Sequence, residues 1–230
     1  MKHTKQSGRG CRRMMRLFLR GWHTEGLKEE RDPTVFLVHH QNMFGPLHAL
    51  PMLPDKARLW TMAAFFHVRT CWRHFYSFTF RRRFRLPRGL SAIAAGAVAL
   101  VLPAALRVLR AVPVHRGSRR IGETLRESSR ALEQGDSLLI CPDLEYSSPS
   151  PEMGGLYTGF LHLEKNFYQA SGRHLAFTPV YCSAQRKTVI AGPPLRFPDG
   201  VPFAQARGEM AARIVSEINR LGRQSGDIIG

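Results

Sequence analysis

Acidic side chains are scarce in this sequence. It has 17 Asp and Glu against 34 Lys and Arg, a formal net charge of +17. Such a surface attracts polyanions, which here means nucleic acid, an anionic membrane or an acidic carrier protein. No helix-turn-helix, ribonucleoprotein-type or zinc-finger pattern accompanies the charge, so we expect no specific nucleic-acid partner.

Cysteine is also scarce, and its spacing excludes the usual cysteine-based metal sites. The four are Cys11, Cys71, Cys141 and Cys182, with no CxxC pair among them. His39, His40 and His48 lie near one another, but no acidic residue or cysteine stands at ligand spacing among them, so we expect no metal. The N-terminus lacks the continuous apolar run of a signal peptide. Together these absences favour a reducing cytoplasm and free thiols.

The apolar residues form an alternating strand and helix pattern. Thr34–Val38, Ser137–Cys141, Ala176–Cys182 and Thr188–Ala191 read as buried strands. Helices are expected after Ser118 with Ile121, Leu125 and Leu132 inward, over 159–169, and near the C-terminus on Met210, Ile214, Ile218 and Leu221. The pattern predicts a single α/β domain over 31–225, with a mixed, largely parallel sheet flanked by helices. Polar loops follow the strands, where sites usually lie.

Two segments bear on membrane contact. Residues 89–106 carry no charge, and their length is at the lower edge of a transmembrane span; a helix dipping into one leaflet or a core helix is expected. The aromatic stretch and Arg81–Arg85 just before it suit a headgroup region. Residues 1–30, a basic amphipathic segment, interleave Arg12, Arg13, Arg16 and Arg20 with apolar residues. An interfacial helix and a frayed basic tail remain open for this segment.

Four segments, read in chain order, resemble the blocks of the phospholipid acyltransferase family, which includes 1-acylglycerol-3-phosphate acyltransferases. They are His39-His-Gln-Asn-Met-Phe-Gly-Pro46, Val112-Pro-Val-His-Arg-Gly-Ser118, Cys141-Pro-Asp-Leu-Glu-Tyr-Ser147 and Phe177-Thr-Pro-Val-Tyr181. The resemblance implies a glycerol-3-phosphate acyltransferase-like fold. It also implies acyl transfer from acyl-CoA or acyl carrier protein, without a bound cofactor, to a lysophospholipid or glycerophosphate hydroxyl. The expected location is the cytoplasmic face of the cell membrane, as a peripheral or monotopic protein.

The resemblance assigns the general base to His40, which would take a proton from the acceptor hydroxyl. The family's aspartate, five residues further on, is replaced by Gly45, so either Asp143 or Glu145 would supply the carboxylate or a backbone carbonyl would hold the ring. The plain alternative is that His39 and His40 only fill a polar loop.

The remaining expected contacts concern the substrate. Arg116, with Gly117, would hold a phosphate, since a guanidinium binds phosphate oxygens bidentately. The other candidate substrate-binding residues are Asn42, Tyr146, Pro179 and Val180. Tyr146 replaces an arginine of the family's third block. Because of these replacements, a catalytically impaired homologue that binds lipid or regulates a partner is the alternative function.

Overall fold

The computed structural model describes residues 2–27 and 32–229. Its internal contacts divide the chain into two compact units, which are described separately. The smaller unit holds residues 1–11 and 59–124, and the larger holds 12–58 and 125–230. The predicted boundary between residues 30 and 31 lies outside the described residues.

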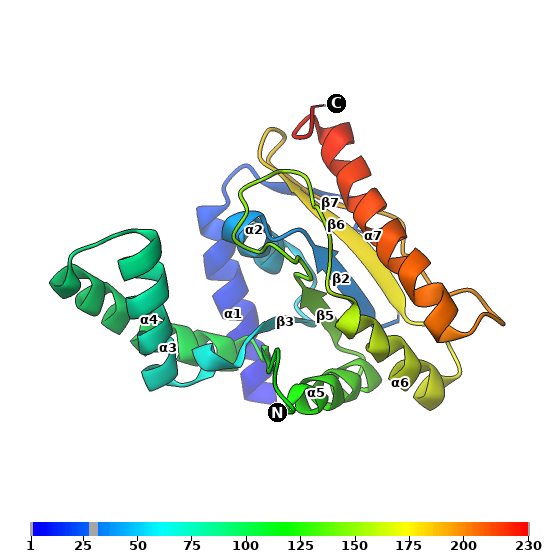
Figure 1. Cartoon of the computed structure of the whole chain (residues 1–230), viewed down its shortest axis with the longest axis horizontal. Coiled ribbons are helices and arrows are strands. Elements are labelled where there is room, and N and C mark those ends of the chain that lie inside the picture. Colours follow the sequence, from blue (N-terminus) through cyan, green and yellow to red (C-terminus); the bar gives the residue numbers. More distant parts are fainter. Residues whose placement is uncertain (1, 28–31, 230) are drawn as a thin grey trace. The chain divides into compact units, whose positions relative to one another are not determined.

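The larger unit is built on five strands in the order β1-β7-β6-β2-β5 (Figure 1). Three of the four strand pairs are parallel, and only β6 and β7 run antiparallel. The strands are β1 (His23–Glu25), β2 (Thr34–Val38), β5 (Ser137–Ile140), β6 (Ala176–Ser183) and β7 (Thr188–Ala191). The predicted α/β class, with a mixed and largely parallel sheet flanked by helices, is confirmed.

Strand β2 is the centre of this sheet. All five of its residues are buried, and it pairs in parallel with β5 on one side and β6 on the other. A strand covered on both faces reads as a continuous apolar run, which is why the sequence revealed it so clearly.

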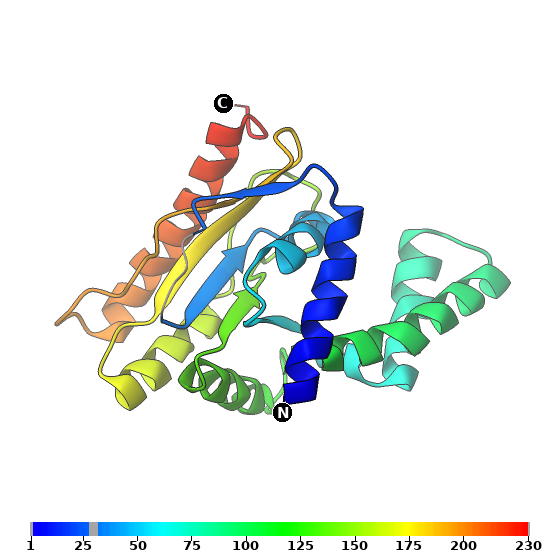
Figure 2. The same ribbon diagram turned by 180° about the vertical axis from the view of Figure 1, so that it is seen from behind.

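The helices of the larger unit cover both faces of the sheet. They are η1 (Gln41–Met43), α2 (Phe44–Met52), η4 (Thr158–Leu161), α6 (His162–Ser171), α7 (Phe203–Ser225) and the second part of α1 (Lys2–Phe18). Side chains alternate along β6, so Tyr181 and Cys182 face opposite ways. Tyr181 packs against Gly222 of α7, whereas Cys182 donates to the carbonyl of Gly45 in α2. Helix α7 therefore covers one face and α2 the other (Figures 1 and 2).

The smaller unit is mainly helical. It contains η2 (Ala63–Phe66), α3 (Val68–His74), the π-helix η3 (Phe75–Arg83) and α4 (Arg88–Val108), with a parallel pair of strands, β3 (Ala57–Met62) and β4 (Val112–Val114). Helix α5 (Ile121–Glu133) begins in this unit and continues in the larger one. The uncharged segment 89–106 is thus one helix, α4.

Several details differ from the sequence-based expectations. Ile121, assigned to an inner helix face, is 39% exposed. The helix expected over 159–169 is divided into η4 and α6. Strands β1 and β3 were not predicted, because neither shows the apolar run or strict alternation on which strand prediction rests.

Candidate functional site

The site lies where β2 and β5 end. These strands are parallel neighbours, with Leu37 paired to Ile140, so the loops that follow them leave the same edge of the sheet. His39 and His40 come directly after β2, and Asp143 comes shortly after β5. The larger unit alone therefore brings together the first and third sequence blocks.

His39 and Asp143 form a buried pair. The ring Nδ1 of His39 bonds the carboxylate of Asp143, and both side chains are only 3% exposed. The other ring nitrogen, Nε2, lies 2.9 Å from the carbonyl oxygen of Ser150. A carbonyl only accepts, so Nε2 carries a proton and the ring has no lone pair left for a substrate.

The Asp143 carboxylate also binds the neighbouring backbone. Both of its oxygens accept from the backbone N–H of His40, each at 3.1 Å. One carboxylate thus ties the β5 loop to two consecutive residues of the β2 loop. A buried carboxylate requires such partners, because an unpaired buried charge is strongly unfavourable.

His40 has different surroundings from His39. Its ring Nδ1 accepts a hydrogen bond from the backbone N–H of Met43 at 3.0 Å. This contact fixes the neutral ring as the tautomer with its proton on Nε2. The ring also lies edge-on to Tyr146, with centroids 5.9 Å apart. In this arrangement Nε2 donates a hydrogen bond and does not accept one.

The turn that presents Met43 to His40 has an unusual backbone. Gln41, Asn42 and Met43 have φ values of 42°, 53° and 77°, a left-handed conformation in three consecutive residues that are not glycine. Left-handed backbone in such residues is costly and tends to occur at ligand-binding and switch regions. The strain lies directly beside the His40 ring.

Gly45 occupies the position of the family aspartate and has no room for a side chain. A Cβ there would lie 1.8 Å from the carbonyl oxygen of His39. With this backbone, no aspartate fits at position 45. The glycine at position 45 is therefore required by the path of the chain past the carbonyl of His39.

The other sequence-predicted residues are distributed unevenly. Asn42 follows His40 by two positions, and the ring of Tyr146 lies beside the ring of His40. The Glu145 side chain is exposed, outside the group formed by His39, His40 and Asp143. Pro179 and Val180 are buried in β6. Arg116 and Gly117 lie in the smaller unit, in an exposed turn after β4.

Tyr181 is a site residue that the sequence did not single out. Its hydroxyl accepts from Nε2 of Gln41 and donates to the carbonyl of Pro151, both at 3.2 Å. Burial, reinforced by the charge of Asp227, raises the pKa of Tyr181 well above its usual value, so the phenol stays neutral. It links the strained turn to the loop that caps His39. The sequence signal for Tyr181 was its position at the end of the fourth block, Phe177–Tyr181.

A separate hollow of about 530 Å³ lies between α5 and α6. Arg126, Ser129, Arg130 and Asn166 are among its lining residues, and none of the candidate site residues lines it.

The chain is similar to the crystal structure of the 1-acyl-sn-glycerophosphate acyltransferase PlsC from Thermotoga maritima. The TM-score is 0.48 at 15% sequence identity, covering 96% of this chain and 78% of that one. No protein-family profile and no curated protein sequence matches the chain.

Proposed function

We propose that this protein transfers a fatty acyl group from acyl-CoA or acyl carrier protein to the hydroxyl of a lysophospholipid or glycerophosphate at a membrane surface. The observation that carries the proposal is the meeting of two loops, which places His40 beside Tyr146 and the Asp143 carboxylate. These residues come from the two blocks that resemble the acyltransferase family.

The proposed reaction begins when the acceptor hydroxyl oxygen attacks the thioester carbonyl carbon. The hydroxyl proton passes to His40 as the oxygen–carbon bond forms. The carbon–sulfur bond then breaks, and the departing thiolate takes the proton back. An anionic acceptor and donor would be attracted by the net charge of +17.

His40 can accept this proton only after the N–H of Met43 leaves Nδ1. The proton is then taken at Nδ1 itself or, after a change of tautomer, at Nε2. The left-handed turn at Gln41, Asn42 and Met43 supports such a rearrangement, because each unfavourable backbone conformation costs on the order of 1–3 kcal/mol. Substrate binding would relax the turn and free the ring.

The test is transfer of a labelled acyl group to lysophosphatidate and glycerol 3-phosphate in the presence of anionic vesicles. Both acyl-CoA and acyl carrier protein are offered as donors. His40→Ala should reduce the rate by about 10²-fold or more, the usual contribution of a general base. His67→Gln, an exposed histidine at the start of α3, is the matched control and should retain activity. Equal rates in wild type and His40→Ala would exclude this role.

A second candidate is a lipid-binding protein that has the site but not the chemistry. Two observations favour it, namely the Met43 N–H on the His40 ring and the lack of space for an aspartate at Gly45. This candidate predicts binding of lysophosphatidate or acyl-CoA, measured by calorimetry, with no transfer from either donor. Binding should then be the same in wild type and His40→Ala.

A further inference from the structure

Helix α4 buries mostly small side chains and exposes several large apolar ones, the reverse of a helix in a water-soluble domain. Apart from Leu106 near its C-terminal end, the residues it buries are small and recur every fourth position: Ser91, Ala95, Ala99 and Pro103. Four of its large aliphatic side chains point outward, with Leu90, Ile93, Leu100 and Val101 between 58% and 73% exposed. A helix of a water-soluble domain places its large apolar residues inward.

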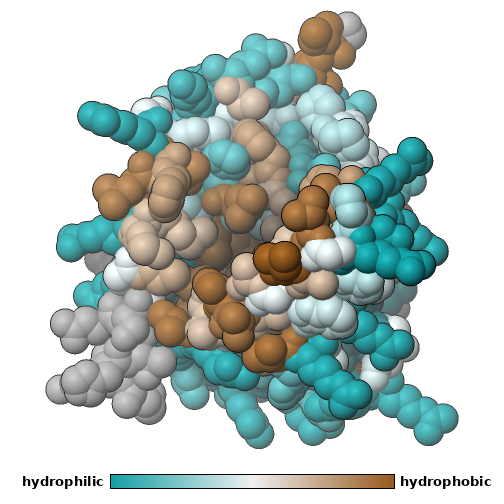
Figure 3. Space-filling model, turned by 90° about the vertical axis from the view of Figure 1, so that its left-hand side faces the viewer, coloured by the Kyte–Doolittle hydropathy of each residue, from teal (hydrophilic) through white to brown (hydrophobic). Residues whose placement is uncertain are grey.

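The small residues let α4 pack closely within the smaller unit. Its partners there are α3, η2 and η3. The large aliphatic side chains on the opposite face are exposed, and this face is apolar from Leu90 to Val101. Figure 3, which views the side where the α3, η3 and α4 hairpin lies, shows hydrophobic residues gathered in the middle of the view with hydrophilic residues around them. An exposed apolar surface of this kind marks a binding surface.

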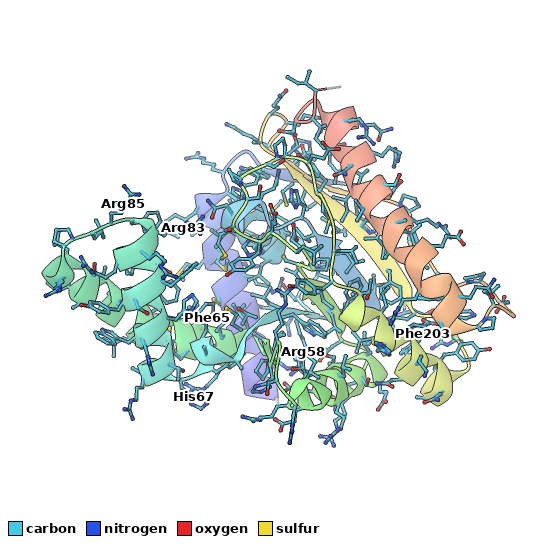
Figure 4. All side chains as sticks on the ribbon, in the orientation of Figure 1. Arg58, Phe65, His67, Arg83, Arg85 and Phe203 are labelled. Atoms are coloured by element: carbon cyan, nitrogen blue, oxygen red, sulfur yellow. The ribbon has the colours of Figure 1, made fainter. Side chains whose placement is uncertain are left out.

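The segment just before α4 is strongly cationic. Arg82, Arg83, Arg85 and Arg88 are exposed there. Arg83 and Arg85 project from the end of η3 and the loop that leads into α4 (Figure 4). A row of arginines beside an apolar face is complementary to anionic lipid headgroups beside acyl chains.

Aromatic side chains lie on the same hairpin. Trp72 is 37% exposed, stacks on Tyr76 at 4.9 Å, and donates its indole N–H to the carbonyl of Ala92 in α4. Phe84 is 59% exposed next to the arginines. Tryptophan and tyrosine are enriched at the membrane–water interface, where an apolar ring and a polar atom are both accommodated.

We propose that the hairpin of α3, η3 and α4 is a monotopic membrane anchor, with the exposed face of α4 in the acyl region of one leaflet and the arginines at its anionic headgroups. At about 1.5 Å per residue, the 21 residues of α4 are long enough to span a bilayer. The helices packed beside it carry exposed Arg69, Arg73 and Arg82. Taking these guanidiniums across the hydrocarbon core is strongly unfavourable, so the hairpin enters one leaflet only.

This inference deepens the proposed function by naming the surface that meets the membrane, and it rests on that function only for the membrane's role. The experiment is sedimentation of the full chain with vesicles of phosphatidylcholine alone and of phosphatidylcholine with phosphatidylglycerol. No donor or acceptor is added, so a failure of catalysis does not affect the result. Wild type should bind the anionic vesicles and lose much of that binding at high salt.

Two variants separate the apolar and cationic contributions. Leu100→Ser combined with Val101→Ser should weaken binding by about tenfold or more, because two aliphatic side chains leave the bilayer. Arg82→Gln combined with Arg85→Gln should weaken binding to anionic vesicles by about fivefold per arginine and leave binding to neutral vesicles unchanged. Val201→Ser, at an aliphatic residue 39% exposed in the larger unit, is the matched control and should bind as wild type.

The alternative to a membrane is that a second copy of the chain covers the exposed face of α4. Light scattering without lipid tests it, since a dimer that dissociates in the Leu100→Ser, Val101→Ser variant would overturn the membrane assignment. Vesicle binding that is the same in wild type and this variant would overturn it as well. A monomer without lipid, together with weakened vesicle binding by the variant, supports the anchor.

Discussion

The ring of His39 is bonded to the carboxylate of Asp143, which follows it by 104 positions in the chain. The next residue, His40, donates its backbone N–H to the same carboxylate, and its ring accepts from the backbone N–H of Met43. Two consecutive histidines therefore have different environments. His39 joins two loops inside the protein, whereas His40 is the histidine beside Tyr146 and the strained turn.

The buried pair makes Asp143→Asn a test of stability. Removing one partner of a buried ion pair costs about 3–5 kcal/mol in the free energy of unfolding. Asp199 provides a matched control, because it also pairs with a histidine, His174, at 3.0 Å but is 95% exposed. Asp199→Asn should change the stability by less than about 1 kcal/mol. Urea denaturation measures both, and similar losses in the two variants would contradict the structural role of Asp143.

An aspartate introduced at position 45, where the resemblance to the acyltransferase family implies one, should not improve the site. Gly45→Asp places a Cβ against the carbonyl oxygen of His39, so it should lower the free energy of unfolding and leave acyl transfer no higher than wild type. Gly45→Ala should destabilise for the same reason. Gly208→Ala in α7, where a Cβ meets nothing within 4 Å, should instead stabilise by about 0.5–1 kcal/mol. Thermal denaturation compares the three, and a stable Gly45→Asp variant with raised activity would refute this account.

Arg12 corrects the expectation of an interfacial arginine on α1. Its guanidinium is 2% exposed and donates to the carbonyls of Leu50, Leu53 and Ala57, which close the end of α2 and begin β3. Each carbonyl left without a donor costs about 1–3 kcal/mol, so Arg12→Leu should lose about 3 kcal/mol or more in unfolding free energy.

The adjacent Arg13 is exposed and gives the control for this change. Arg13→Leu should alter stability by no more than about 0.5 kcal/mol, as is usual for surface substitutions. Guanidinium unfolding curves measure both variants. An equal effect at the two positions would show that Arg12 has no special structural role.

The cluster of His174, Glu164 and Asp199 gives a prediction for pH dependence. Burial lowers the pKa of His174, but the hydrogen bonds and charges of Glu164 and Asp199 outweigh it and raise the pKa above its ordinary value of 6.5. A raised pKa in the folded state stabilises the protein below the unfolded value and ceases to do so as the pH rises through the folded value. His174→Gln should therefore cost more stability at about pH 5.5 than at about pH 9. Urea unfolding at the two pH values measures this, and an equal cost would exclude the ion pairs as its source.

The sequence predicted the strands better than the details of the site. Thr34–Val38 and Thr188–Ala191 were predicted with the bounds they have, because buried strands form unbroken apolar runs. The polar loops that the sequence placed after β2 and β5 leave the same edge of the sheet, because these two strands are parallel neighbours. The π-helix over Phe75–Arg83 was not foreseen, since aromatic density alone does not determine the helix type.

The choice between His39 and His40 could not be made from sequence. Successive side chains of a strand point to opposite faces, so one histidine turns inward and the other does not. Every residue of β2 is buried, so its apolar pattern does not show on which face of the sheet Asp143 lies. The clash at Gly45 was also invisible, because it depends on the path of the chain past the His39 carbonyl.

The histidine ring nitrogens can be observed directly by long-range proton–nitrogen correlation NMR, assigned with His39→Gln and His40→Gln. We predict that Nε2 of His39 carries a proton, which it donates to the carbonyl of Ser150, and that the neutral ring of His40 carries its proton on Nε2. Adding lysophosphatidate should then release Nδ1 of His40 from the Met43 N–H if the protein is an acyltransferase. A neutral His40 ring with its proton on Nδ1 in the protein alone, or a His39 ring without a proton on Nε2, would contradict the site as described.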